Sequence, residues 1–152
     1  MGNLKIYVRA ILIPVILGSI VGILISGSMD YEMLQQPLFA PPSWIFPVVW
    51  TILYVLMGVS YGRLESKGLA DASVKAIYYA QLIANLLWPI VFFVFKWRLF
   101  AFFWILLLVG LVIKMIIEFY KRDNLSGLLQ IPYLVWLTFA TYLNLSVYLL
   151  NR

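Results

Sequence analysis

The side chains of this chain that could do chemistry are aromatic rings and a few amides. The 152 residues include six Trp, ten Tyr and ten Phe, and they include neither His nor Cys. A Ser-His-Asp triad, a thiolate nucleophile and a metal held by Cys or His are therefore excluded. We expect no metal site, no required cofactor and no ordinary catalytic residue. The remaining chemistry is ring stacking, indole and amide hydrogen bonding, and the reactivity of a bound ligand.

Three of the tryptophans, Trp50, Trp88 and Trp136, lie inside long apolar runs or beside prolines. A buried indole N–H needs a hydrogen-bond partner, either within the protein or on a ligand. Trp50 and Tyr54 are one helical turn apart, so one face of their helix is aromatic. Two interpretations of this face stay open: a packed aromatic core, or a cavity for a flat ligand.

Polar groups within the apolar runs are few. Gln81 and Asn85 are one helical turn apart, and both are expected to face the interior because an unpaired amide is costly in hydrocarbon. Either they bond neighbouring helices together, or Asn85 orients a ligand. The six acidic residues all stand in loops or near the ends of apolar runs. General acid–base catalysis and proton-coupled transport are therefore not expected.

The elements that must position these groups are membrane helices. Hydrophobic residues make up 64% of the chain and charged residues 11%, against roughly 25% charged in a soluble domain. The charged residues divide the chain into apolar runs long enough to cross the bilayer. We predict an all-α integral membrane protein, a five-transmembrane-helix bundle forming a single domain over residues 1–152. The predicted helices cover approximately residues 6–26, 43–62, 75–95, 99–119 and 127–150.

Prolines and small residues shape the predicted spans. Four prolines within residues 37–47 make a stiff apolar segment, either a lid over the bundle or a packed turn, and Ser43 is the expected N-cap of the second helix. Pro89 and Pro132 are each expected to interrupt a helix and widen the bundle. A stripe of small residues on the first helix, Gly18, Gly22 and Ser26, permits close contact within the bundle or in a homodimer.

The distribution of Lys and Arg predicts the topology. Eight lie on the side of the N-terminus and three, Lys96, Arg98 and Arg152, on the other side. The positive-inside rule then places the N-terminus inside and the C-terminus outside. The first apolar run is longer than the usual core of a cleaved signal, so we expect it to be retained as a helix. The basic residues are scattered singly, which argues against nucleic-acid binding.

Several motifs together resemble one family. They are P-L-F-A-P-P-S-W at 37–44, V-W-T-I-L-Y-V-L-M-G at 49–58, N-L-L-W at 85–88, P-Y-L-V-W at 132–136 and F-A-T-Y-L-N at 139–144. In this order they resemble the translocator protein family (TspO/MBR), also called tryptophan-rich sensory protein or peripheral-type benzodiazepine receptor. The resemblance covers essentially the whole chain.

The resemblance implies a dimeric five-helix bundle in a membrane, here expected to be a bacterial cell membrane, with a cavity near the first loop. It implies binding of porphyrins such as protoporphyrin IX, and of isoquinoline and benzodiazepine-type drugs. Carried over by position, the ligand-binding residues are Tyr31, Pro42, Ile45, Trp50, Tyr54, Asn85, Trp88, Trp136, Ala140 and Leu143. The alternative function is light- and oxygen-dependent porphyrin breakdown, in which Trp50 and Trp136 would be the reactive indoles. The sterol-binding consensus is weak here, so cholesterol is not predicted.

Overall fold

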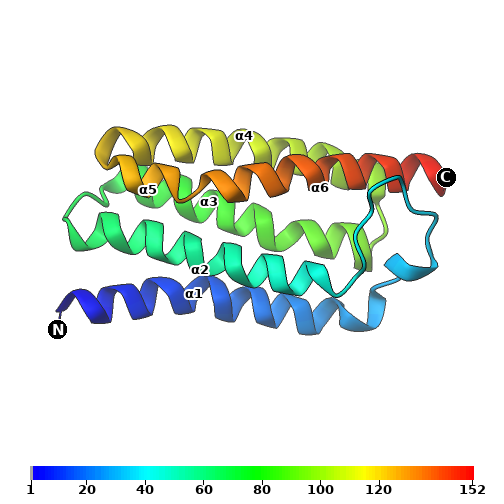
Figure 1. Cartoon of the computed structure of the whole chain (residues 1–152), viewed down its shortest axis with the longest axis horizontal. Coiled ribbons are helices and arrows are strands. Elements are labelled where there is room, and N and C mark those ends of the chain that lie inside the picture. Colours follow the sequence, from blue (N-terminus) through cyan, green and yellow to red (C-terminus); the bar gives the residue numbers. More distant parts are fainter. Residues whose placement is uncertain (1) are drawn as a thin grey trace.

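Five long apolar helices run the length of the molecule in the computed structural model, which describes residues 2–152 (Figure 1). They are built from α1 (Gly2–Ile25), α2 (Ile45–Ser66), α3 (Ala72–Pro89), α4 (Arg98–Arg122) and α6 (Ile131–Leu150). Four short elements complete the chain: η1 (Ser26–Ser28), η2 (Tyr31–Met33), η3 (Ile90–Val94) and α5 (Asn124–Leu128). Residues 2–152 contain no strand. The predicted five-helix membrane bundle is confirmed.

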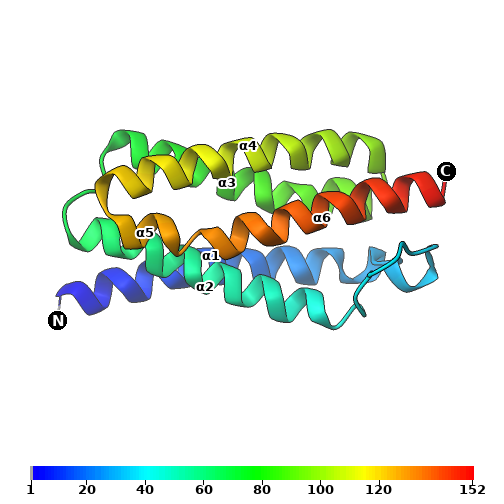
Figure 2. The same cartoon turned by 45° about the horizontal axis from the view of Figure 1, so that its top comes forward.

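The long helices lie side by side and alternate in direction (Figures 1 and 2). The N-terminus is at one end of the bundle with the short α2–α3 and α4–α5 connections, and we call this the closed end. The C-terminus is at the other end with the long segment 26–44, and we call this the loop end. Short connections hold consecutive helices antiparallel, while segment 26–44 is long enough to cover the interior at the loop end.

Two aspartates fix helix starts at the closed end. Asp71 caps α3 by accepting from the Val74 N–H, and Asp123 caps α5 by accepting from the Ser126 N–H. The bond from Val74, and then the ion pair with Arg122, lower the pKa of Asp71. Hydrogen bonds from Arg63 (2.6 Å) and Lys67 (2.9 Å) to the Asp123 carboxylate hold its pKa well below the usual value. Both caps therefore stay charged, which suits a helix N-terminus.

Two boundary predictions were wrong. The helix α2 begins at Ile45, and Ser43 is not its N-cap: the Ser43 hydroxyl donates to the Glu32 carboxylate (2.5 Å) instead. Pro132 does not interrupt a helix, because the last span is already divided into α5 and α6 and Pro132 is the second residue of α6. Proline suits the first helical turn, where a missing N–H costs no hydrogen bond.

The observed helices differ from the predicted ranges mostly at their ends. The first helix begins at residue 2 rather than 6, and α4 continues to 122 rather than 119. Pro89 ends the regular part of the third span, which continues as the π-helix η3. Because Pro89 has no N–H, it cannot donate to the carbonyl one turn earlier, and a wider turn follows.

Candidate ligand cavity

A cavity of about 850 Å³ occupies the loop end of the bundle. The helices α1, α2, α3 and α6 form its walls, and residues of segment 26–44 form its roof. Most of the lining is apolar or aromatic, with a few polar groups contributed by separate helices. Its volume is within the range of pockets that hold drug-sized molecules, which is roughly 300–1,000 Å³.

The structure brings most of the predicted site residues together. The cavity is lined by Tyr31, Trp50, Tyr54, Asn85, Trp88, Trp136, Ala140 and Leu143. Pro42 and Ile45 lie outside the lining. A turn closed by the bond from the Ile45 N–H to the Pro42 carbonyl (3.1 Å) leaves Pro42 exposed, and Ser43, Trp44 and Phe46 line the cavity instead. What each residue does toward a ligand stays a prediction.

A buried hydrogen-bond network begins at the cavity wall and continues into the core. The Tyr54 hydroxyl donates to Asn85 Oδ1 (2.7 Å), and Asn85 Nδ2 donates to the Tyr133 hydroxyl (2.7 Å). The Tyr133 hydroxyl donates in turn to Gln81 Oε1 (2.8 Å). Gln81 and Asn85 face the interior as predicted, and their amide hydrogen bonds join α2, α3 and α6. The amide of Asn85 is therefore held in one orientation beside the cavity.

Two cavity indoles differ in their hydrogen bonding. Trp88 Nε1 donates to Asn144 Oδ1 (2.9 Å), and Asn144 Nδ2 donates to the Arg98 carbonyl (2.8 Å). Trp136 Nε1 is buried and has no hydrogen-bond partner among residues 2–152. An unpaired buried donor costs roughly 1–3 kcal/mol. The Trp136 N–H is therefore an unsatisfied donor that is enclosed within the wall rather than exposed to the cavity.

Aromatic rings that sequence reasoning missed complete the walls. Phe46 contacts both Tyr31 (ring centroids 5.0 Å apart) and Trp136 (5.9 Å). Phe92 stacks on Trp88 at 5.0 Å, and Phe92 and Phe93 both line the cavity although they are consecutive. The π-helix η3 accounts for this, because its altered turn departs from the regular helical periodicity. Pro89 was the only signal of that turn in the sequence.

The roof is attached to the bundle at several points. Asp30 accepts from Arg98 Nη2 (2.7 and 2.8 Å) and from Lys96 Nζ (3.2 Å). Gln35 and Asn151 exchange two hydrogen bonds of 2.9 Å. Partial burial raises the pKa of Asp30, but the bonds from Arg98 and Lys96 lower it by more, so its pKa lies below the usual value. These contacts hold segment 26–44 over the cavity.

The chemistry of the cavity favours binding over acid–base catalysis. Its lining contains two carboxylates, Asp30 and Glu32, and both lie in the roof. Asp30 is paired with Arg98 and Lys96, while Glu32 accepts from Ser43. The arrangement offers stacking surfaces and a fixed amide. These groups suit a flat, mostly apolar molecule.

The five apolar spans, four of which border the cavity, define a multi-pass membrane protein. The TspO/MBR family matches this chain over residues 10–150. The tryptophan-rich protein TspO of Archaeoglobus fulgidus is 41% identical over 122 residues, which cover 80% of this chain and 79% of the relative. Protein CrtK of Rhodobacter capsulatus is 38% identical over 136 residues, covering 86% and 83%. The human translocator protein is 36% identical over 128 residues, covering 80% and 75%. The chain belongs to the TspO/MBR family, as its motifs predicted.

Proposed function

We propose that this protein binds a flat hydrophobic ligand of the porphyrin class in the cavity, in tetrapyrrole sensing, storage or transport. The observation that carries the proposal is the cavity itself, about 850 Å³ in volume, whose walls include the rings of Trp50, Trp88 and Trp136. A porphyrin has a large π surface that suits the ring-lined walls. Isoquinoline and benzodiazepine-type drugs, which are also flat and apolar, would compete for the same cavity.

A titration with protoporphyrin IX tests the proposal. Detergent-solubilised protein is titrated in the dark while tryptophan fluorescence is followed. We expect saturable quenching, and weaker binding by Trp136→Phe because phenylalanine offers a smaller stacking surface to the cavity than the indole does. Trp104→Phe is the matched control, since Trp104 Nε1 donates to the Ala84 carbonyl (2.8 Å) and Trp104 does not line the cavity. Absence of saturable quenching in the wild type would refute porphyrin binding.

Light- and oxygen-dependent porphyrin breakdown is the second candidate. It is favoured by the presence of both Trp50 and Trp136 in the lining, where either indole could give an electron to an excited porphyrin. Illuminating the bound complex in air separates the two functions. A porphyrin spectrum that stays unchanged supports binding alone, whereas loss of the porphyrin bands that depends on Trp50 or Trp136 supports degradation.

We also propose that the N-terminus lies in the cytoplasm of a bacterial cell and the C-terminus outside. The support is the excess of Lys and Arg at the closed end. The chain has no cysteine, so single-cysteine variants report cleanly on topology. Ser73→Cys at the closed end should resist a membrane-impermeant thiol reagent in intact cells, and Asn151→Cys should react. The reverse pattern would contradict the proposed orientation.

A further inference from the structure

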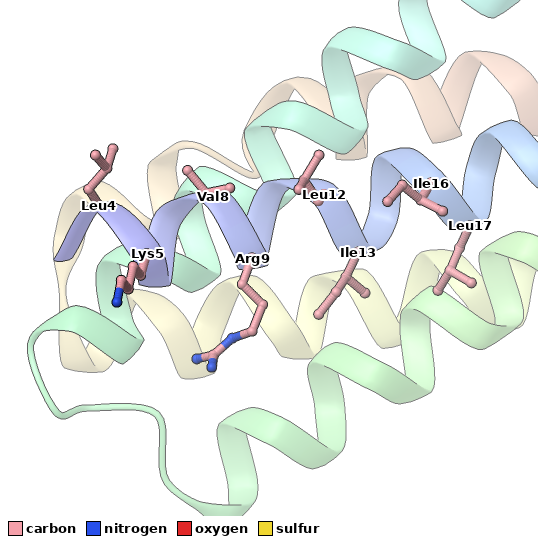
Figure 3. Close-up of a pocket in the computed structure, with 8 residues that line it drawn as sticks. All are labelled: Leu4, Lys5, Val8, Arg9, Leu12, Ile13, Ile16 and Leu17. Atoms are coloured by element: carbon pink, nitrogen blue, oxygen red, sulfur yellow. The ribbon is translucent and has the colours of Figure 1, made fainter. Parts of the chain in front are cut away.

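A shallow groove runs along α1 and shares no lining residue with the ligand cavity (Figure 3). Its volume is about 650 Å³. Two rows of side chains border it: Leu4, Val8, Leu12 and Ile16 form one, and Lys5, Arg9, Ile13 and Leu17 form the other. Each row repeats every four residues, which is the spacing of a ridge on an α-helix. The groove between the rows therefore follows the axis of α1.

The groove faces the space that lipid occupies. Only Ala10, Pro14 and Ile25 are buried among the residues of α1 that the structure describes. The groove residues Leu4, Leu12 and Ile16 are 64%, 46% and 50% exposed. Because α1 is a membrane span, this exposed apolar surface contacts acyl chains rather than water.

The two polar residues of the groove are both cations, and both lie toward the closed end. Arg9 forms an ion pair with Glu65 at the end of α2. Lys5 forms no ion pair within residues 2–152. The remaining six groove residues are apolar. One end of the groove therefore carries an uncompensated positive charge, and the rest of the groove carries none.

The length of the groove matches one leaflet of a bilayer. Leu4 and Leu17 are thirteen positions apart, which is about 20 Å along a helix axis. Half of the hydrocarbon core is about 15 Å thick. With Lys5 and Arg9 at headgroup depth, Ile16 and Leu17 lie near the bilayer midplane. The groove thus spans the depth of one acyl chain and the adjoining headgroup.

We propose that this groove, formed by two ridges of α1 with Lys5 and Arg9 at its closed end, binds one anionic phospholipid. The phosphate lies beside Lys5 and Arg9, and one acyl chain lies along Leu12, Ile13 and Ile16. A second copy of the chain fits this face less well. A twofold dimer joined through the groove would place Lys5 and Arg9 beside the same cations of the other copy. The small residues suited to close helix contact, Gly18 and Gly22, line the cavity instead.

Native mass spectrometry of delipidated protein tests this proposal. Dioleoyl phosphatidylglycerol and dioleoyl phosphatidylcholine, which differ only in headgroup, are titrated separately, and the dissociation constant of the first bound lipid is measured. We expect about fivefold tighter binding of the anionic lipid, the effect of one uncompensated cation near the headgroups. The variant Lys5→Gln/Arg9→Gln should reduce this ratio to about one.

Two further variants make the result specific to the groove. Lys114→Gln/Lys121→Gln removes the same charge from exposed positions on α4 and should keep the fivefold ratio. Leu12→Trp fills the groove without changing charge and should weaken both lipids. An equal loss of preference in both double variants, or no preference in the wild type, would overturn the proposal. So would a Leu12→Trp variant that changes only the oligomeric state, because the face would then be an interface between copies.

Discussion

The pair α1 and α2 is packed in opposite ways at its two ends. At the closed end, a Cβ on Gly58 would lie 2.4 Å from the Ile11 Cα and 2.6 Å from the Ala10 carbonyl oxygen, so the two backbones touch. At the loop end, a Cβ on Gly22 would meet nothing within 4 Å, and Gly22 lines the cavity. Glycine therefore marks a tight backbone contact at one end of the helix pair and an open space at the other.

The residues opposite the glycines differ between the two ends. Opposite Gly58, α1 presents the backbone of Ala10 and Ile11. Toward the loop end, the ring of Tyr54 on α2 lies against Gly18 of α1, while nothing lies within 4 Å of a Cβ on Gly22. A small-residue stripe thus allows close contact, but the facing helix decides whether contact occurs.

The largest effect is expected at the backbone contact of the closed end. Gly58→Ala puts a methyl group against the backbone of α1, which cannot move without separating the helices. We expect a loss of roughly 1–3 kcal/mol in stability, the usual cost of overpacking, measured by thermal unfolding in detergent. Gly22→Ala is the control and should change stability by less than about 0.5 kcal/mol. Equal effects would show that the ends are packed alike.

A second comparison concerns two buried tyrosines. Tyr133→Phe removes the hydroxyl that joins Asn85 to Gln81, leaving a buried donor and a buried acceptor without a partner. We expect a loss of about 1–2 kcal/mol in the same unfolding measurement. Tyr78→Phe removes a buried hydroxyl that has no partner in the described chain, so it should be neutral or stabilising. A destabilising Tyr78→Phe would contradict this description of the core.

A third comparison uses two glycines that both line the cavity. A Cβ on Gly18 would lie 2.3 Å from the Tyr54 ring, so Gly18→Ala should displace the ring and break its bond to Asn85. We expect roughly tenfold weaker porphyrin binding, equivalent to about 1.4 kcal/mol. Gly22→Ala should leave binding nearly unchanged. Identical affinities for the two variants would mean that Tyr54 does not orient the ligand.

The smallest effect is expected in the roof. The pKa of Asp30 is lowered in the folded protein, so its pairing stabilises the fold above the usual aspartate pKa of about 3.9 and is lost as the pH falls through the lowered value. Asp30→Asn should cost about 1 kcal/mol or less at pH 7, and this cost should shrink as the pH falls through the lowered pKa of Asp30. Melting temperatures of both proteins as a function of pH provide the test, and a difference that does not shrink on acidification would exclude the ion pairs as its cause.

Much of this molecule could be predicted from the sequence because lipid imposes simple rules. Run length and charge located the five spans, and the cost of an unpaired amide placed Gln81 and Asn85 inside. The inward turn of Phe92 and Phe93 could not be predicted, because a π-helix changes the helical period that the prediction assumes. Ser43 was misassigned because its hydroxyl bonds to Glu32 of the roof, a contact that local capping rules do not include.

If a flat ligand occupies the loop end of the bundle, as proposed, a large side chain introduced into the cavity wall should exclude it. Ala140 is buried and lines the cavity, whereas Thr138 on the same helix is exposed to lipid. Protoporphyrin IX is titrated in the dark into the wild type, Ala140→Phe and Thr138→Phe, following porphyrin absorbance. We predict that Ala140→Phe abolishes saturable binding while Thr138→Phe binds like the wild type. Unchanged binding by a folded Ala140→Phe variant would contradict the assignment of the cavity as the ligand site.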